Sequence, residues 1–137
     1  MSRIDDAGRR LGLKKIEASG IPTRSLNRED AARLTLFQYM IGNLDWDMTH
    51  GPTPNECCHN SKLLGPPSDA REQITPVAYD FDYSGLVDAP YAVPPVSIPV
   101  QRVTQRFYRG LCSHNAETRS QVAQFIAARG TLEAELG

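Results

Sequence analysis

The sequence contains few cysteines, no long apolar run and no overall excess of basic residues. Its 3 cysteines cannot all pair with one another, which excludes the fully paired disulfide frameworks of small secreted domains. No segment approaches the roughly 20 apolar residues that a membrane-spanning helix needs, so we expect no membrane span. The residues after Met1 lack the apolar core of a secretory signal, and we therefore expect no signal peptide to begin there.

The size and composition suit one soluble globular domain. The chain has 137 residues, of which 40% are hydrophobic and 23% are charged. Within this domain we distinguish an N-terminal arm, residues 1–26, from a helical core with an acidic loop region, residues 27–137.

The net charge of -1 hides an acidic middle between two basic ends. Residues 43–100 hold eight acidic and two basic residues, whereas the segments on either side carry a net positive charge. An acidic middle argues against nucleic acid as a partner. It suits the binding of a cation or of a metal–phosphate complex. A solvated acidic loop region would contain the same number of acidic residues.

Two helices are expected in the first third of the chain. The charged stretch 1–12 predicts a short helix. Asn27 is a good N-cap, and the apolar stripe that follows it predicts a mostly buried helix over 28–41. Gly42 ends this pattern in the way that helix C-terminal caps do.

Two more helices are expected near the C-terminus. The pattern over 101–111 predicts a helix whose arginine face is exposed to solvent, formed by Arg102, Arg106 and Arg109. Asn115 is expected to cap a last helix, with Val122, Phe125 and Ile126 facing inward.

The strand signals are few and central. Leu13–Ala18 predicts a strand or an extended arm, 59–64 predicts a short strand, and Ile74–Phe81 gives the clearest strand because it is rich in β-branched and aromatic residues. A polar loop, 45–58, and a proline-rich loop, 83–99, lie around them. Few strands among several helices predict an α+β fold that is mostly helical, with a small central hairpin or short sheet.

Carboxylates in apolar surroundings suggest a metal site. Asp45 lies beside Trp46, and Phe81 separates Asp80 from Asp82. On the predicted strand Asp80 and Asp82 share one face, where they repel each other unless a cation such as Mg²⁺ or Mn²⁺ compensates. The alternative is structural, since the residues from Asp82 onward also suit a turn.

The cysteines leave several states open. A bridge from Cys57 or Cys58 to Cys112 would form in an oxidising compartment. A zinc site that adds His59 to the cysteines is disfavoured, because adjacent cysteines do not easily reach one ion. A cysteine hydrolase lacks a visible oxyanion feature. We therefore expect buried free thiols.

Three short motifs resemble the C-terminal lobe of atypical protein-kinase-like folds, namely the HipA-type and spore-coat CotH-type kinases. Gly42-Asn43-Leu44-Asp45 is similar to the loop that carries the catalytic Asp in those families. Asn60, before a short strand that ends in Leu63-Leu64, is similar to the second element. The segment Pro76–Asp82 is similar to a strand whose final Asp holds the metal.

The resemblance implies a kinase C-lobe that transfers a phosphoryl group from ATP with Mg²⁺ or Mn²⁺. Asp45 would orient or deprotonate the acceptor hydroxyl, Asn60 and Asp80 would bind the metal, Asp82 would replace or assist Asp80, and Lys62 would contact the nucleotide. Asp45 and Asn60 are 15 residues apart, more than in those families, so the residues from His50 to Cys58 would have to loop out.

The chain also resembles a group of uncharacterised bacterial proteins through Phe37–Asn43, Tyr79–Val87 and Tyr108–Gly110. A bacterial cytoplasmic location is therefore expected by default, or an extracytoplasmic one if a signal lies upstream. A whole kinase is about twice this length, so we expect an upstream N-lobe and, without it, a catalytically silent C-lobe with a protein as one candidate substrate.

A non-catalytic function is the alternative. In this interpretation the acidic residues cap turns, and the proline-rich loop Pro90–Pro99 wraps a protein partner, with contacts from Tyr83 and Tyr91.

Overall fold

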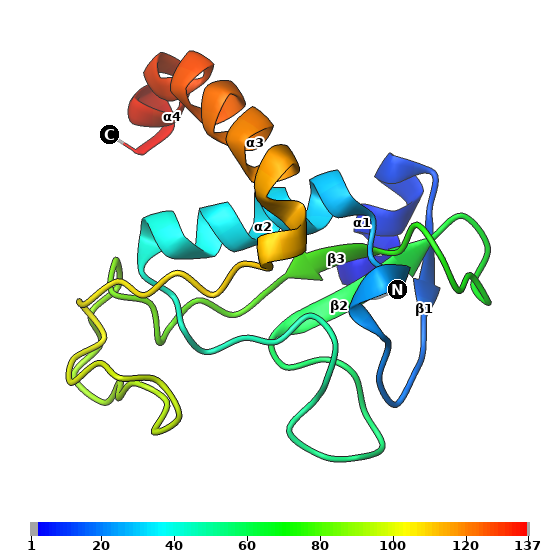
Figure 1. Ribbon diagram of the computed structural model, residues 1–137, viewed down its shortest axis with the longest axis horizontal. Coiled ribbons are helices and arrows are strands. Elements are labelled where there is room, and N and C mark those ends of the chain that lie inside the picture. Colours follow the sequence, from blue (N-terminus) through cyan, green and yellow to red (C-terminus); the bar gives the residue numbers. More distant parts are fainter. Residues whose placement is uncertain (1–2, 137) are drawn as a thin grey trace.

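A three-stranded antiparallel sheet and four α-helices form the fold in this computed structural model, which describes residues 3–136 (Figure 1). The predicted α+β class with a small central sheet is confirmed. Among the described residues, no helix is both long enough and apolar enough to cross a membrane.

The sheet has the strand order β1-β2-β3, with β1 at Lys14–Ile16, β2 at Ser61–Gly65 and β3 at Thr75–Ala78. Pro76 is tolerated in β3 because this strand lies at an edge of the sheet. The predicted strand over 74–81 is too long, since Asp80 has a left-handed backbone with φ 63°. The expectation that Asp80 and Asp82 alternate on one strand face is therefore wrong, because both residues follow the end of the strand.

Helix α2, Arg28–Ile41, has the bounds that the sequence predicted. The Asn27 side chain accepts a hydrogen bond from the Asp30 amide at 3.0 Å, and Gly42 ends the helix in the left-handed conformation. Two apolar clusters fill the core that α2 and the sheet share. One is formed by Leu26, Ala31, Leu34, Trp46 and Met48, and the other by Ile16, Cys58, Leu63 and Ile74.

The N-terminal residues pack onto the sheet. Helix α1, Arg3–Leu11, was predicted, and residues 1–2 of that prediction lie outside the described residues. The chain turns at Gly12, with φ 69°, and enters β1, which pairs with β2. Ile16 and Leu26 are buried, so the segment interpreted as an arm contributes a strand and core side chains.

The predicted helix over 101–111 is wrong, because this segment is irregular. Two of its arginines bind backbone oxygens: Arg106 donates to the Met40 carbonyl at the end of α2, and Arg109 donates to the loop that follows. Arg102 is exposed and makes no such bond within the described residues. The last carbonyls of a helix have no partner within the helix, so they attract such donors. Arg106 and Arg109 thus gain contacts that an exposed helix face would not offer.

The chain ends with a short 3₁₀ turn, Cys112–His114, and two helices, α3 at Asn115–Ala127 and α4 at Arg129–Leu136. His114, not Asn115, stands at the N-cap position of α3. The expected inward face is wrong for two of its three residues, since Val122 is 39% exposed and Ile126 is 70% exposed, while Phe125 is half-buried. The buried side chain of α3 is polar Gln121, which faces α2.

Candidate functional site

The candidate site lies at the open end of the β2–β3 hairpin. Asn60 precedes β2 and Asp80 follows β3, and the Tyr79 amide donates to the Asn60 carbonyl at 3.0 Å beyond the last strand pair. Asn60 and Asp80 both have left-handed backbones, with φ 52° and 63°. Asn and Asp adopt this conformation more readily than other residues that carry a side chain. Asn60 and Asp80 therefore lie at the same end of the β2–β3 hairpin.

Asp45 also lies at this end of the hairpin, because backbone hydrogen bonds close the loop that follows it. The Asp47 amide donates to the His59 carbonyl at 2.9 Å, and the His59 amide donates to the His50 carbonyl at 3.1 Å. The residues between them loop out below the sheet, as the spacing required (Figure 1). The Asn60 amide group then donates to the Asp45 carbonyl at 2.8 Å and to Asp45 Oδ2 at 3.0 Å.

His59 is a site residue that sequence reasoning missed. Its Nε2 lies 2.6 Å from Asp45 Oδ1, so Asn60 and His59 hold the two carboxylate oxygens of Asp45. The side chains of His59 and Asp45 are 36% and 28% exposed, which leaves both open to a ligand. The signal in the sequence is the position of His59 directly before Asn60, and from the sequence His59 suggests only a zinc ligand.

Buried polar groups fix the backbone on the inner side of Asp45. The Asp45 amide donates to Asn43 Oδ1 at 3.1 Å, and Trp46 Nε1 donates to the Asn43 carbonyl at 2.9 Å. Asn43 in turn donates to Gln38 Oε1 on α2 at 2.8 Å, and both side chains are buried. A chain of hydrogen bonds that begins at buried Gln38 thus fixes the backbone of Asp45, the candidate base.

Arg109 holds the same loop from the other side. It donates to the Leu44 carbonyl at 2.8 Å and to the Trp46 carbonyl at 2.7 Å, and its guanidinium lies 5.0 Å from the Trp46 ring centroid. Burial lowers the pKa of Arg109, while the charges of Asp47 and Asp45 act in the opposite direction. The sequence interpretation of this residue as part of a solvated arginine face is wrong.

Asp80 and Asp82 form the acidic side of the site. The pKa of Asp80 is raised, mainly by a side-chain hydrogen bond with Asp82 and then by desolvation. The negative charges of Asp82 and Asp45 also raise this pKa slightly, whereas the backbone hydrogen bond from Asp82 lowers it. Asp82 has a further partner, because the Tyr91 hydroxyl donates to its Oδ2 at 3.0 Å.

A cleft of about 750 Å³ opens next to Asn60. Lys62, on β2, lies on its wall with its Nζ 5.3 Å from the ring centroid of Tyr79. His59 lines both this cleft and a smaller cavity of about 250 Å³ that contains Asp45 and Arg109. Most residues that line the large cleft are polar or charged, two are cysteines, and three are apolar: Lys15, Glu17, Asn55, Glu56, Cys57, Cys58, His59, Asn60, Lys62, Tyr79, Ile16, Ala18 and Pro52.

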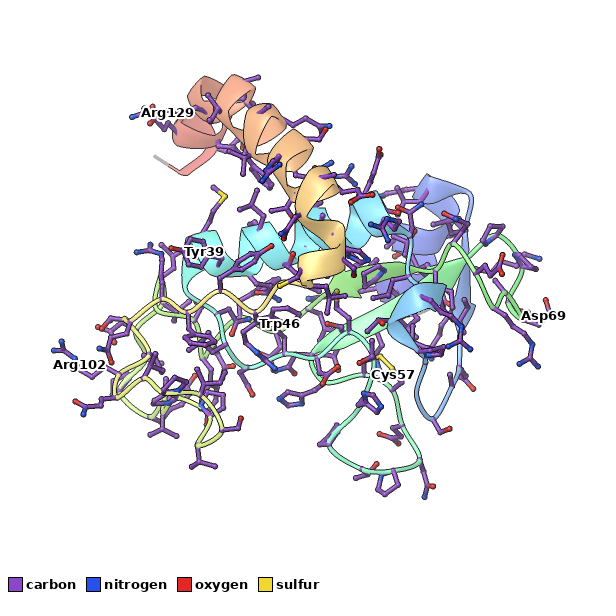
Figure 2. All side chains as sticks on the ribbon, viewed as in Figure 1. Tyr39, Trp46, Cys57, Asp69, Arg102 and Arg129 are labelled. Atoms are coloured by element: carbon purple, nitrogen blue, oxygen red, sulfur yellow. A yellow bond between two sulfur atoms is a disulfide. The ribbon has the colours of Figure 1, made fainter. Side chains whose placement is uncertain are left out.

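The cysteines do not adopt the expected states. Cys57 and Cys58 form a disulfide with each other (Figure 2). Cys112 is a free, exposed thiol. The expectation of buried free thiols is therefore wrong, the alternative bridge to Cys112 is not formed, and the cysteine–histidine zinc set is not assembled. Within residues 3–136, no group of three or more His, Cys, Asp or Glu side chains is placed to hold a metal ion.

Comparisons of the chain with protein-family models, with curated proteins and with solved structures find no match.

Proposed function

We propose that the open end of the β2–β3 hairpin is a metal–nucleotide site of a kinase-like phosphotransferase lobe. One observation supports this most strongly: Asp45 and Asn60, which are 15 residues apart, are in direct contact at the end of the hairpin. A candidate base thus touches a candidate amide ligand, and a candidate carboxylate ligand, Asp80, follows the second strand at the same end.

The residues present suit Mg²⁺ or Mn²⁺. These ions prefer oxygen ligands, and proteins commonly hold Mg²⁺ through one or two carboxylates together with substrate phosphates, so a three-carboxylate cage is not required. Asn60 uses its amide nitrogen on Asp45, and none of the described residues donates to its Oδ1. We take Asp80 as the first choice of carboxylate ligand, because its Oδ1 accepts only a long hydrogen bond from the Asp82 amide at 3.5 Å, whereas Asp82 Oδ2 accepts one from the Tyr91 hydroxyl at 3.0 Å. The bound ion would neutralise charge on the nucleotide phosphates.

In this proposal, Asp45 accepts the proton of an acceptor hydroxyl. His59 and Asn60 fix its carboxylate, so its orientation does not have to be set when a substrate binds. The nucleotide would lie in the large cleft beside Asn60, where Lys62 offers a cation and Tyr79 an aromatic ring.

A thermal melt with and without Mn²⁺·ATP tests the site. A ligand at 100 times its dissociation constant adds about 2.7 kcal/mol of stability, which raises the melting temperature of a domain of this size by several degrees. We expect this shift in the wild type and its loss in Asp80→Asn. The matched control is Asp69→Asn, because Asp69 lies in the β2–β3 turn at the opposite end of the hairpin (Figure 2). Absence of a shift in the folded wild type at millimolar Mn²⁺·ATP would contradict the proposal.

Asp45→Asn separates binding from chemistry. Because Asp45 is assigned to the acceptor hydroxyl and not to the metal, this variant should keep the melting shift with Mn²⁺·ATP. Phosphoryl transfer is assayed with radiolabelled ATP in the protein extended upstream to include the expected N-lobe. In that protein, Asp45→Asn should lower the transfer rate by about 100-fold or more. If Asp45→Asn transfers phosphate at the wild-type rate, Asp45 is not the base.

A protein-binding function of the proline-rich loop is the second candidate. It is favoured by three exposed side chains on this loop, Tyr91 at 60%, Val93 at 67% and Val96 at 106% exposure. Crosslinking in cells, followed by comparison of wild type with Val96→Asp, tests it. A partner that crosslinks to the wild type and is lost from the variant would support this function, and equal crosslinking would contradict it.

A further inference from the structure

The adjacent cysteines Cys57 and Cys58 form a disulfide on the wall of the large cleft, directly before two site residues. Cys58 packs in the core with Ile16, Leu63 and Ile74, whereas Cys57 is only half-buried. One sulfur of the bond is therefore anchored in the apolar core, and the other is accessible from the cleft.

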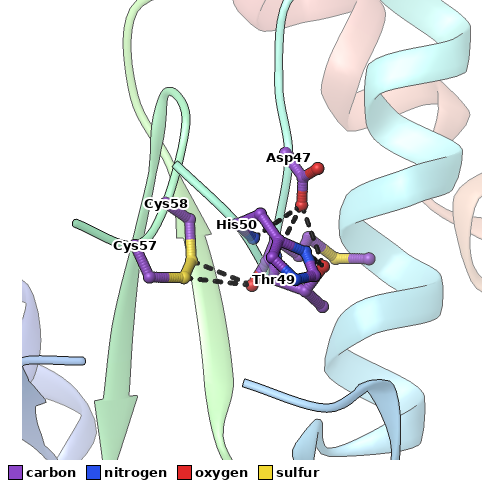
Figure 3. Close-up of a disulfide and its surroundings, with 6 residues drawn as sticks. Asp47, Thr49, His50, Cys57 and Cys58 are labelled. Carbon is purple, nitrogen blue, oxygen red and sulfur yellow. Dashed lines mark hydrogen bonds between the residues drawn. A yellow bond between two sulfur atoms is a disulfide. The ribbon is translucent and has the colours of Figure 1, made fainter. Parts of the chain in front are cut away.

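A rigid turn faces the sulfur atoms. Asp47 Oδ1 accepts hydrogen bonds from the Thr49 amide at 2.7 Å, the Thr49 hydroxyl at 3.0 Å and the His50 amide at 2.9 Å (Figure 3). This turn presents the Met48 carbonyl oxygen to the disulfide, at 3.0 Å from Cys58 Sγ and 3.9 Å from Cys57 Sγ. A thiol can donate a hydrogen bond to that oxygen and a disulfide cannot, so reduction changes the contact between the turn and the cysteines.

The same turn is coupled to the site. His59 pairs through its backbone with Asp47 and His50, and its side chain holds Asp45. A disulfide between neighbouring residues closes a small ring that includes their peptide bond, and reduction opens this ring one residue away from His59. Rotation freed at Cys58 therefore acts directly on the backbone that positions the imidazole.

We propose that Cys57 and Cys58 are a redox-active pair that exchanges with dithiol reductants, and that its redox state controls how firmly His59 and Asn60 hold Asp45. A thiolate of the reductant attacks Cys57 Sγ and forms a mixed disulfide, while Cys58 leaves as a thiolate and takes up a proton. The second thiol of the reductant then releases Cys57 and becomes oxidised. In total, two electrons and two protons pass to the pair, and the dithiol becomes a disulfide.

The experiment uses the Cys112→Ser protein, which removes the free thiol and leaves the pair intact. The protein is equilibrated in dithiothreitol buffers from oxidising to reducing, and the thiols are then alkylated and counted by mass spectrometry. We expect no added alkyl group at the oxidising end and two at the reducing end. Two alkyl groups in every buffer would overturn the proposal, because the pair would not form.

Two conformational measurements follow the same series of buffers. Hydrogen exchange at His59 and Asn60 should become about tenfold faster on reduction, and fluorescence of Trp46, the only tryptophan in the chain, should change with the same midpoint. The control is Cys57→Ser with Cys112→Ser, which cannot form the bond and should give constant signals. Reduction without a change in exchange at these residues would overturn the coupling. These measurements need no nucleotide, so they test the redox proposal even if Mn²⁺·ATP causes no melting shift.

Discussion

The core around α2 and the C-terminal helices α3 and α4 are held in place by different kinds of interaction. The core contains two clusters of buried apolar side chains. Helix α3 is tied to α2 by polar contacts, and neither apolar cluster includes a residue of α3: Arg28 donates to Glu117 at 2.7 Å, and Arg33 donates to Gln121 at 3.0 Å. From this contact α3 and α4 project away from the sheet (Figure 1).

The difference predicts how each region responds to its surroundings. Apolar burial is non-directional and changes little with pH or salt, whereas ion pairs at the surface weaken when a partner is protonated or screened. The candidate site lies at the end of the β2–β3 hairpin and in the loop after α2, and none of its residues belongs to α3 or α4. We therefore expect the site to persist under conditions that loosen α3 and α4.

The largest effect should come from a cavity in the core. Leu63 is 1% exposed, and Leu63→Ala should lower the free energy of unfolding by about 2–5 kcal/mol, since its contacts are lost and the space is only partly refilled. Urea denaturation measures this change. Leu132→Ala in α4 is the control, because Leu132 is 37% exposed, and its effect should be several times smaller. Equal losses would contradict the division into two regions.

Arg109→Ala should have the next largest effect, because it removes the link between the C-terminal segment and the loop of Asp45. Two carbonyls lose their donor and Trp46 loses its cation, so we expect a loss of about 2 kcal/mol and a change in Trp46 emission. Arg102→Ala is the control, since Arg102 is exposed and makes no side-chain hydrogen bond or ion pair within the described residues. Unchanged emission in Arg109→Ala would show that the loop does not depend on Arg109.

Acidification should loosen α3 before the core. Burial, together with the charge of Arg28, lowers the pKa of His114 below its ordinary 6.5, and the hydrogen bond from Arg28 lowers the pKa of Glu117 below its ordinary 4.5. Both groups therefore bind fewer protons in the folded state than in the unfolded state. Their contribution to stability is complete above these ordinary values and is lost as the pH falls through the lowered ones.

Hydrogen exchange of the α3 amides against pH measures this loosening. Exchange at the start of α3 should become severalfold faster, after correction for the intrinsic rate, while exchange in β2 stays constant. Glu117→Gln should produce the faster exchange already at neutral pH. Glu133→Gln is the matched control, because Glu133 pairs with Arg129 within α4. Simultaneous loosening of β2 and α3 would mean that the two regions open together.

The smallest effect is expected for Asp80→Asn without metal. The raised pKa of Asp80 means that its charged form is disfavoured in the folded state, so stability falls as the pH rises through that pKa. Removing the charge should therefore leave the melting temperature unchanged or raise it by no more than roughly a degree or two, since solvent screens this exposed group. A lower melting temperature would indicate that Asp80 serves structure rather than ligand binding.

The local elements of the fold could be predicted where short-range chemistry decides them. The Asn27 cap and the terminal Gly42 fixed both ends of α2 in advance. The segment 101–111 was mistaken for a helix because its arginines find acceptors on Met40, Leu44 and Trp46, residues far away in the sequence. The buried face of α3 was wrong for a similar reason, since Arg33 offers a partner to Gln121.

For the candidate site, the amino-acid sequence by itself determined which residue types are available: carboxylates at 45, 80 and 82, an amide at 60, and the α2 boundaries that lead into Asp45. Only the tertiary structure decided that Asp45 meets His59 and Asn60, that Arg109 supports their loop and that Cys57 pairs with its neighbour. Caps and turns depend on neighbouring residues, so the sequence shows them. Contacts across a closed loop depend on pairing between distant segments, which is fixed only when the sheet and α2 bury their apolar faces together.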